Sequence, residues 1–264
     1  MNQPLTPLHC RQLHIPPHNF WRSGSLVAIF VRCPTSPHIP MSGNKNTYLT
    51  VQLPPASIDG LAALAGHLTK MAAALPAGPS GKVPSFRAME RGVMHMTFFF
   101  AGEQLVGLNG DRLAAFHTAV VAAAALAGGP RDTELVFVGL RLFPPGKNNL
   151  IVAEYAAPGW LSLLQAEVER IAAEHSVGTS DSVRRDPAAN CAAAQWVPHV
   201  TLGKIRATRA TVGGVGATLV QAGAAVATPL NVGGFRPRGL NVGGFHPRQR
   251  WLDWAIPFAL GSQP

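Results

Sequence analysis

Two short segments of the chain each place a histidine two residues before a threonine inside an apolar run: Met94-His95-Met96-Thr97 and Pro198-His199-Val200-Thr201. Side chains two residues apart in a strand share a face, so each segment presents its histidine and threonine together. An imidazole takes up or releases a proton near neutral pH, and a hydroxyl donates a hydrogen bond. Two such pairs supply the acid, the base and the donors that hydrolysis of a phosphodiester needs without a metal ion.

A third copy of the pattern, His67-Leu68-Thr69, has a different context. It lies in residues 57–75, where apolar residues recur at helical spacing. On a helix, residues two apart point roughly 200° apart. This copy therefore cannot present both groups together, and we interpret it as an ordinary helix-surface histidine and threonine.

The elements that must position the two motifs follow from periodicity and from turn signals. Besides the two motif strands, we expect strands at residues 47–53, 134–142, 150–155 and 251–260. We expect helices at 57–75, with Ser57 as N-cap, from Asn109 to Gly128-Gly129-Pro130, and at 158–175. We expect loops at 76–85, 144–149 and 178–194. Strand-helix-strand units thus occur twice, with one motif in each half. This order predicts an α+β fold of two similar lobes that face each other across a cleft.

The motifs and their surroundings resemble the 2H phosphoesterase superfamily, which is named for two H-x-[ST]-x motifs. Residues 94–103 look like its first motif strand and turn, and residues 135–145 resemble the middle strand and turn of LigT-like members. Residues 149–155 and 161–175 look like the strand and helix that follow, and residues 196–206 look like the second motif with a basic residue downstream. The resemblance covers about residues 46–206.

This resemblance implies a pseudo-symmetric fold of antiparallel sheets around a central cleft, with a helix pair outside. It also implies that His95, Thr97, His199 and Thr201 are the catalytic residues and that no metal or organic cofactor is needed. The expected reaction is hydrolysis of a 2′,3′-cyclic phosphate at an RNA end or on a nucleotide, with a 2′-phosphate as the favoured product. The sequence does not assign the acid and the base.

Four further residues are candidate substrate contacts. Lys204 follows His199 by five positions, and strict alternation places it on the opposite face, so a bulge or a strand end is needed to bring it to the substrate. A solvated lysine at a strand end is the alternative. Phe99 shares the His95 face by alternation and is the one member of Phe98-Phe99-Phe100 expected to line the cleft, although adjacent aromatics are typical of a core. Arg87 and Arg91 are comparable phosphate candidates.

Composition indicates an anionic partner. The chain has 264 residues, enough for one sizeable core, and carries a formal net charge of +9 at pH 7. We expect the partner to be an RNA terminus or a nucleotide with a cyclic phosphate, and the protein to be a monomer. No apolar stretch approaches the ~20 residues of a transmembrane helix, so membrane spanning is not expected.

The three cysteines, Cys10, Cys33 and Cys191, show no C-x-x-C spacing and leave one over in any disulfide scheme. This pattern favours a reduced intracellular compartment, cytoplasmic or nuclear. None of the three lies in a recognisable nucleophile motif. The motif histidines bring no second histidine or carboxylate at metal-ligand spacing on the same element, so we expect no metal site.

We expect residues 1–45 to be a separate leader ahead of a domain at 46–264. The first acidic residue of the chain is Asp59, while Arg11, Arg22, Arg32 and Lys45 are all basic. An organelle-targeting segment has this composition. Prolines at positions 4, 7, 16, 17, 34, 37 and 40 disfavour an amphipathic helix, so a disordered leader is the alternative.

Near the end of the chain, residues 230–238 (LNVGGFRPR) recur as residues 240–248 (LNVGGFHPR). We interpret the repeat as a duplication within a flexible Gly/Pro-rich insertion. An arginine-rich phosphate contact is the alternative. In the closing strand, Trp251 and Trp254 are expected to pack in the core or at the edge, with base stacking as the other option.

Two other classes of function remain open. The first is a non-catalytic nucleotide- or RNA-binding module of the same fold, which retention of both histidines and both threonines disfavours. The second is an interaction protein in which the two motifs are fortuitous. This reading requires two matched coincidences and a chance similarity of their surroundings.

Overall fold

The computed structural model describes residues 47–102, 108, 110–127, 133–143, 149–177, 196–244 and 254–258. These residues belong to one compact unit, Met41–Pro264. The leader expected at residues 1–45, the loop at 178–194, the cap at Asn109, the stop at Gly128-Gly129-Pro130 and most of the hairpin turn lie outside the described residues.

The described strands form one eight-stranded antiparallel sheet with the order β4-β5-β6-β3-β1-β7-β8, and β2 pairs with β6 beside β3. Their bounds are β1 Thr47–Val51, β2 Ser85–Ala88, β3 Met96–Gly102, β4 Val136–Phe143, β5 Leu150–Ala156, β6 His199–Arg206, β7 Gly239–Gly244 and β8 Trp254–Pro257. The described helices are α1 Pro55–Ala73, the 3₁₀ turn η1 Arg91–Val93, α3 Gly110–Leu126, α4 Gly159–Glu174 and α5 Val212–Ala227.

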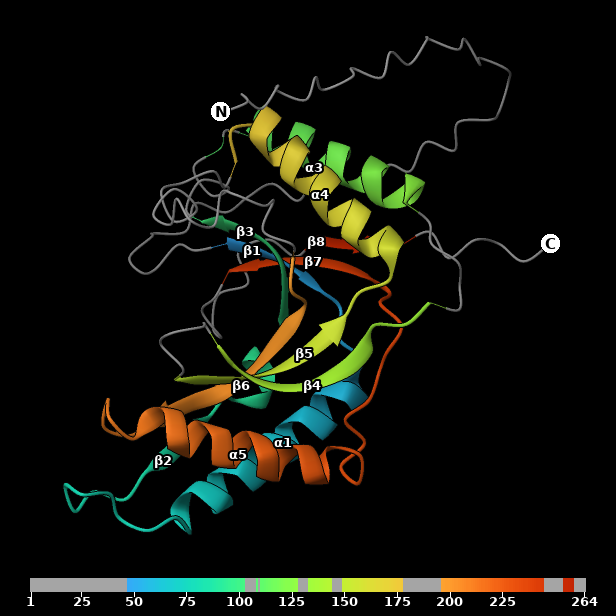
Figure 1. The fold of residues 1–264 in the computed structure, drawn as a ribbon. Coiled ribbons are helices and arrows are strands. Elements are labelled where there is room, and N and C mark those ends of the chain that lie inside the picture. The colour runs from blue at the N-terminus through green and yellow to red at the C-terminus, as the bar shows by residue number, and fades with distance from the viewer. Residues whose placement is uncertain are drawn as a thin grey trace, which may run out of the picture. The chain divides into compact units, whose positions relative to one another are not determined.

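The sheet divides into two lobes at the junction of β3 and β6. Helices α1 and α5 pack on each other and cover one face of β2, β6, β5 and β4 (Figure 1). Helices α3 and α4 pack on each other and lie against β3 and β8 in the group β3, β1, β7 and β8 (Figure 1). Each lobe has four strands and two outer helices, so the expected two-lobed α+β architecture is confirmed. Each lobe draws its elements from both halves of the chain.

The core lies between the helices and the helix-facing side of the sheet. Residues Leu61, Leu64 and Leu68 line the buried stripe of α1 at spacings of three and four and are fully buried. In β1, Leu49 and Val51 are buried while Tyr48 and Thr50 are partly exposed, as alternation requires. Burial of one face leaves the opposite face of the sheet for polar side chains.

Two details of the expected elements are corrected. Helix α1 begins at Pro55 after Pro54 as N-cap, not after Ser57. Proline is favoured in the first turn of a helix because its missing N–H has no helical partner there. The helix α5 and the strand β2 were not anticipated by the periodicity.

The tail repeat is also different from the expected loop. The first copy is an irregular segment joined to the sheet by a bridge between Leu135 and Phe235. The first five residues of the second copy belong to β7 (Gly239–Gly244), which pairs with β1 and β8 in the interior of the sheet. The flexible-loop interpretation is therefore wrong for this part of the repeat, because burial of Leu240 fixes it as a strand.

Candidate active site

The two motif strands meet at a single residue pair. Strands β3 and β6 are antiparallel and pair at Met96 and Val200, the central residue of each motif. One step to either side, antiparallel geometry sets His95 opposite Thr201 and Thr97 opposite His199. Since cross-strand partners share a face, all four side chains lie on the face opposite Met96 and Val200, which are both fully buried. The motifs are thereby related by a pseudo-twofold axis.

Both histidines are held in the same way. His95 Nδ1 lies 2.8 Å from the carbonyl oxygen of Val93, and His199 Nδ1 lies 2.8 Å from that of Val197. A carbonyl only accepts, so Nδ1 carries the proton in each ring and Nε2 is the nitrogen that exchanges protons. The repeat is thus longer than H-x-T: it reads V-x-H-x-T in both places.

An indole links the second motif to the first. Trp196 Nε1 donates a hydrogen bond to the carbonyl oxygen of Thr97 over 3.0 Å. Its ring meets Phe98 edge-on with 5.1 Å between ring centroids. Because Trp196 lies three residues before His199, this contact fixes the approach of the second motif to the first.

Each histidine also has an aromatic neighbour from an adjacent strand. The ring of Tyr48 on β1 lies 5.9 Å from that of His95, and Phe143 at the end of β4 lies 4.6 Å from His199. Tyr48 also contacts Phe100 at 4.9 Å. These aromatic residues provide apolar walls beside the polar groups. None of Tyr48, Phe100 and Phe143 was predicted to line the site.

Burial distinguishes His95 electrostatically. Loss of solvent lowers the pKa of His95, and the charge that His199 can carry lowers this pKa further, while the carbonyl of Val93 opposes both effects. His95 is therefore neutral at pH 7. Burial also raises the pKa of the Tyr48 phenol, so Tyr48 stays protonated.

Two bulges in β3 correct the expected position of Phe99. Strand β1 pairs Leu49 with Phe99 but Thr50 with Thr97, so Phe98 is an extra residue in the ladder; Ala101 is the second. The extra residue reverses the alternation, and Phe99 lies on the buried face with Leu49. The prediction that Phe99 shares the His95 face is wrong. Phe100 lies on that face instead.

A bulge of the same kind acts on Lys204. Strand β5 pairs Val152 with Thr201 but Ile151 with Gly203, so Leu202 is the extra residue. As a result Lys204 returns to the face of Thr201 and is exposed there. The bulge on which the Lys204 hypothesis depended is present.

The two candidate arginines, Arg87 and Arg91, differ in the charged groups beside them. Arg87 on β2 pairs across from Lys204 and shares its face. Two cations directly opposite each other destabilise a sheet, so this arrangement suits an anion. Arg91 instead pairs with Asp59 at 2.5 Å, and this bond lowers the pKa of the Asp59 carboxyl. The structure gives Arg91 a carboxylate partner in place of a phosphate.

One further charged pair lies on the same face. Glu154 is the β5 partner of His199, and Arg141 on β4 forms a salt bridge of 3.2 Å with Glu154. Neither residue belongs to a motif in the sequence. Each is the one charged residue of an otherwise apolar strand, Arg141 in β4 and Glu154 in β5, and this was the sequence signal that could have identified them.

The third H-x-T copy lies on a helix, as expected. His67 and Thr69 are part of α1, and Thr69 donates its hydroxyl hydrogen bond to the carbonyl of Ala65 within the same helix.

Among the described residues, no three His, Cys, Asp or Glu side chains are close enough together to hold a metal ion. No helix in the described part of the chain is sufficiently long and apolar to cross a membrane.

Comparison with known proteins gives matches among solved structures. No protein-family model matches the chain, and no curated protein matches its sequence. Usb1 of Kluyveromyces marxianus is 13% identical, with a TM-score of 0.46 over 81% of this chain and 98% of that one. E. coli LigT in its apo form is 13% identical, with a TM-score of 0.43 over 82% and 99%. TT0787 of Thermus thermophilus is 22% identical, with a TM-score of 0.38 over 62% and 75%.

Proposed function

We propose that the chain is a metal-independent phosphodiesterase that hydrolyses 2′,3′-cyclic phosphates of RNA ends or nucleotides. The observation that carries the proposal is the shared face of His95, Thr97, His199 and Thr201 around the Met96–Val200 pair. A phosphate on this face has an imidazole on each side, as in-line attack and departure require. The substrate contacts are His95, Thr97, His199, Thr201, Lys204 and Phe100.

In this mechanism His95 is the general base. Its lowered pKa keeps Nε2 unprotonated at pH 7, ready to take a proton from the attacking water. The water oxygen forms a bond to phosphorus on one side, and the bond from phosphorus to the ribose 3′ oxygen breaks on the other. His199, in its protonated form, donates the Nε2 proton to that leaving oxygen. The product carries a 2′-phosphate, as the LigT-like resemblance implies.

The remaining groups stabilise the charge that develops on the phosphorane oxygens. The hydroxyls of Thr97 and Thr201 donate hydrogen bonds to the two non-bridging oxygens. Lys204 adds a positive charge on the same face, and the ring of Phe100 stacks against the base or the ribose. None of these roles needs a cofactor.

The test uses purified protein with adenosine 2′,3′-cyclic phosphate in the presence of a chelator, followed by product identification. We expect a 2′-monophosphate as the product. His95→Ala and His199→Ala should each lower kcat by about 10²–10⁴-fold, since each removes a proton carrier. His67→Ala is the matched control and should retain the wild-type rate. Binding without turnover would instead favour the non-catalytic module, and rescue of a chelated enzyme by added metal would contradict the mechanism.

A further inference from the structure

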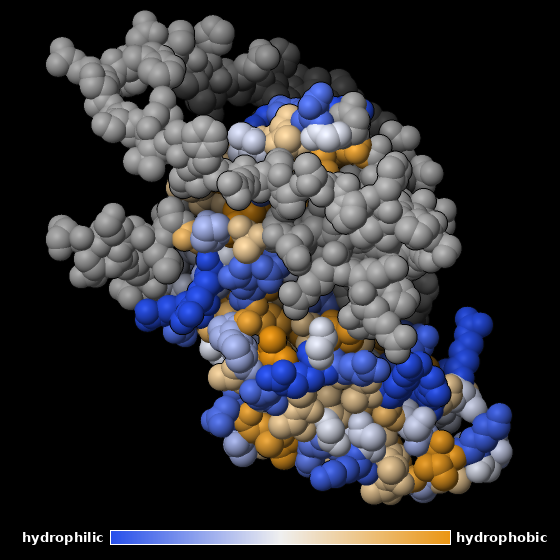
Figure 2. Space-filling view, turned by 180° about the vertical axis from the view of Figure 1, so that it is seen from behind, coloured by the Kyte–Doolittle hydropathy of each residue, from blue (hydrophilic) through white to orange (hydrophobic). Residues whose placement is uncertain are grey.

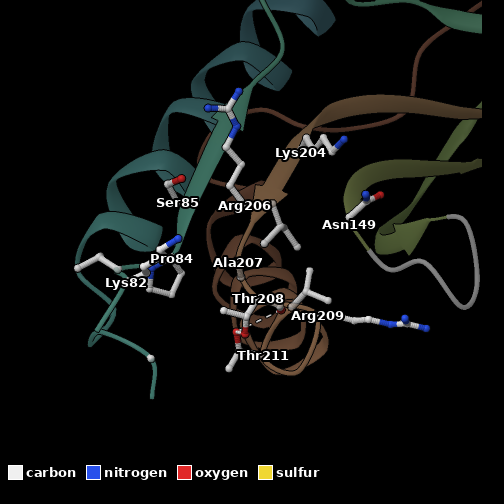
Figure 3. A pocket seen from close by; sticks show the side chains of 14 residues that line it. Lys82, Pro84, Ser85, Asn149, Lys204, Arg206, Ala207, Thr208, Arg209 and Thr211 are labelled. Carbon is white, nitrogen blue, oxygen red and sulfur yellow. Dashed lines mark hydrogen bonds between the residues drawn. The ribbon is translucent and has the colours of Figure 1, made fainter. Parts of the chain in front are cut away.

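A cavity of about 760 Å³ lies at the end of β6, where the chain turns into α5. The polar side chains that line it include Lys82, Ser85, Lys204, Arg206, Arg209 and Thr211. Figure 3 shows Lys82 and Pro84 on the segment that leads into β2 and Ser85 at the start of β2, across from Ala207 and Thr208, while the Arg209 side chain extends away from them. We call this feature the cationic cavity.

The charge of the cavity is of one sign. Four of its lining residues are cationic (Lys82, Lys204, Arg206 and Arg209) and none is acidic. All four are exposed, and within the described part of the chain none of them forms a salt bridge. Uncompensated like charges around a concave surface concentrate anions there. Such a cavity therefore fits a ligand with several negative charges.

Lys204 links the cavity to the face of the candidate active site. Lys204 lines the cavity and also shares the face of Thr201 because of the Leu202 bulge. Arg206 lies on that face as well, opposite Ser85 of β2. At about 3.3 Å per residue, the five steps from Thr201 to Arg206 span roughly 16 Å. Figure 2 shows hydrophilic side chains in a band across the lobe that carries α1 and α5.

The cavity also offers apolar and hydrogen-bonding surface. Val83 is 55% exposed, so a ribose or a base finds an apolar contact there. Thr208 and Thr211 hold each other through a hydroxyl hydrogen bond of 2.8 Å, drawn as a dashed line in Figure 3. Their position at the start of α5 adds the partial positive charge of a helix N-terminus.

We propose that the cationic cavity binds the sugar-phosphate backbone of single-stranded RNA upstream of the terminal phosphate held between the two motifs. The preferred substrate is then an oligonucleotide end rather than a free cyclic mononucleotide. This proposal takes its substrate from the proposed function, whereas its binding surface depends only on the cavity.

The test compares two substrates, adenosine 2′,3′-cyclic phosphate and an octanucleotide that ends in a 2′,3′-cyclic phosphate. For Lys82→Ala/Arg209→Ala, we expect the ratio of kcat/KM on the octanucleotide to kcat/KM on the mononucleotide to fall at least tenfold. The slope of log kcat/KM against log salt for the octanucleotide should become shallower by about 1.4, since two phosphate contacts are lost.

Lys82→Ala and Lys70→Ala are the matched single-charge pair. Lys70 is exposed in the last turn of α1 and does not line the cavity. Only Lys82→Ala should change the ratio. An unchanged ratio and slope in the double variant, with turnover intact, would overturn the cavity proposal and leave the proposed function standing.

A binding measurement separates the two proposals if the wild-type protein turns over neither substrate. Fluorescence anisotropy with a 5′-labelled octanucleotide carrying a 3′-phosphate then reports on RNA binding without the reaction, and the variants isolate the contribution of the cavity. Weaker binding by the double variant than by Lys70→Ala supports the RNA surface without the reaction. Equal binding by both variants, or preferential binding of a phosphopeptide of equal charge, overturns it.

Discussion

At the scale of single residues, the two histidines share one tautomer but differ in their surroundings. Hydrogen bonds from Nδ1 to Val93 and Val197 orient both rings alike. The pKa of His95 is lower than that of an ordinary histidine, and burial is the largest cause. Equivalent positions in the motifs therefore do not imply equivalent roles, and the shift is the physical basis for making His95 the base.

The pH profile tests this assignment. Because the pKa of His95 is lowered, the neutral form persists to lower pH, and the acidic limb of kcat/KM should lie below the ordinary value of about 6.5. His199→Gln removes a charge that lowers the pKa, so the pKa of His95 should rise in this variant. NMR titration of the His95 ring measures both values. A His95 pKa above 6.5 in the wild type would contradict the assignment.

At the scale of elements, strand type follows from the sequence but strand register does not. Alternation correctly groups His95 with Thr97 and His199 with Thr201. It fails beyond the bulges at Phe98 and Leu202. No glycine or charged residue adjoins Phe98 to mark the first bulge, whereas Gly203 beside Leu202 is a signal for the second. A bulge is decided by the partner strand, and the pairing of β1 with β3 was not visible in the sequence.

Helix α5 was missed for a related reason. Its glycines lower helix propensity, so no local signal favoured a helix. Tertiary packing overrides that propensity: a Cβ on Gly216 would lie 2.6 Å from Leu142 Cδ2, and one on Gly223 would lie 2.5 Å from Leu140 Cδ1. These glycines let α5 approach β4 closely, which only the folded arrangement reveals.

The bulge at Phe98 makes two adjacent phenylalanines behave differently. Phe99 lies in the core, so Phe99→Ala should lower the free energy of unfolding by about 3 kcal/mol. Phe100 lies on the face of the motifs beside Tyr48, so Phe100→Ala should cost less stability and raise KM. Urea denaturation and steady-state kinetics measure the two effects. The opposite pattern would restore Phe99 to the substrate face.

Close packing of β2 on β6 is tested at Gly203. A Cβ there would lie 2.5 Å from Phe86 Cζ and closer still to the Arg87 carbonyl oxygen, so Gly203→Ala must push β2 away. We expect a loss of about 1–3 kcal/mol in the free energy of unfolding. Gly66→Ala on α1, where a Cβ meets no atom within 4 Å, is the control and should stabilise the protein. Equal stability of the two variants would contradict the packing.

At the scale of the whole molecule, the proposed reaction depends on how the two lobes are joined. The sequence indicates two lobes with one motif each, but not the residues that hold them in register. The structure shows two direct links between the motif strands, the Met96–Val200 pair and the Trp196 hydrogen bond to Thr97. Since attack and departure occur on opposite sides of one phosphorus, small shifts between the lobes misalign both histidines.

Trp196→Phe isolates the second link. The variant keeps an aromatic ring to pack on Phe98 but loses the N–H that binds the Thr97 carbonyl. We expect the free energy of unfolding to fall by about 1 kcal/mol and kcat to fall about tenfold with little change in KM, because the motifs lose their relative alignment. The matched control is Trp160→Phe, which removes the hydrogen bond of 2.7 Å from the Trp160 indole to the Thr133 hydroxyl. Thermal unfolding and steady-state kinetics of both variants test this role of Trp196. We expect a comparable loss of stability in the two variants and a loss of kcat in Trp196→Phe alone. Equal kcat values would show that the Met96–Val200 pair is sufficient to align the two histidines.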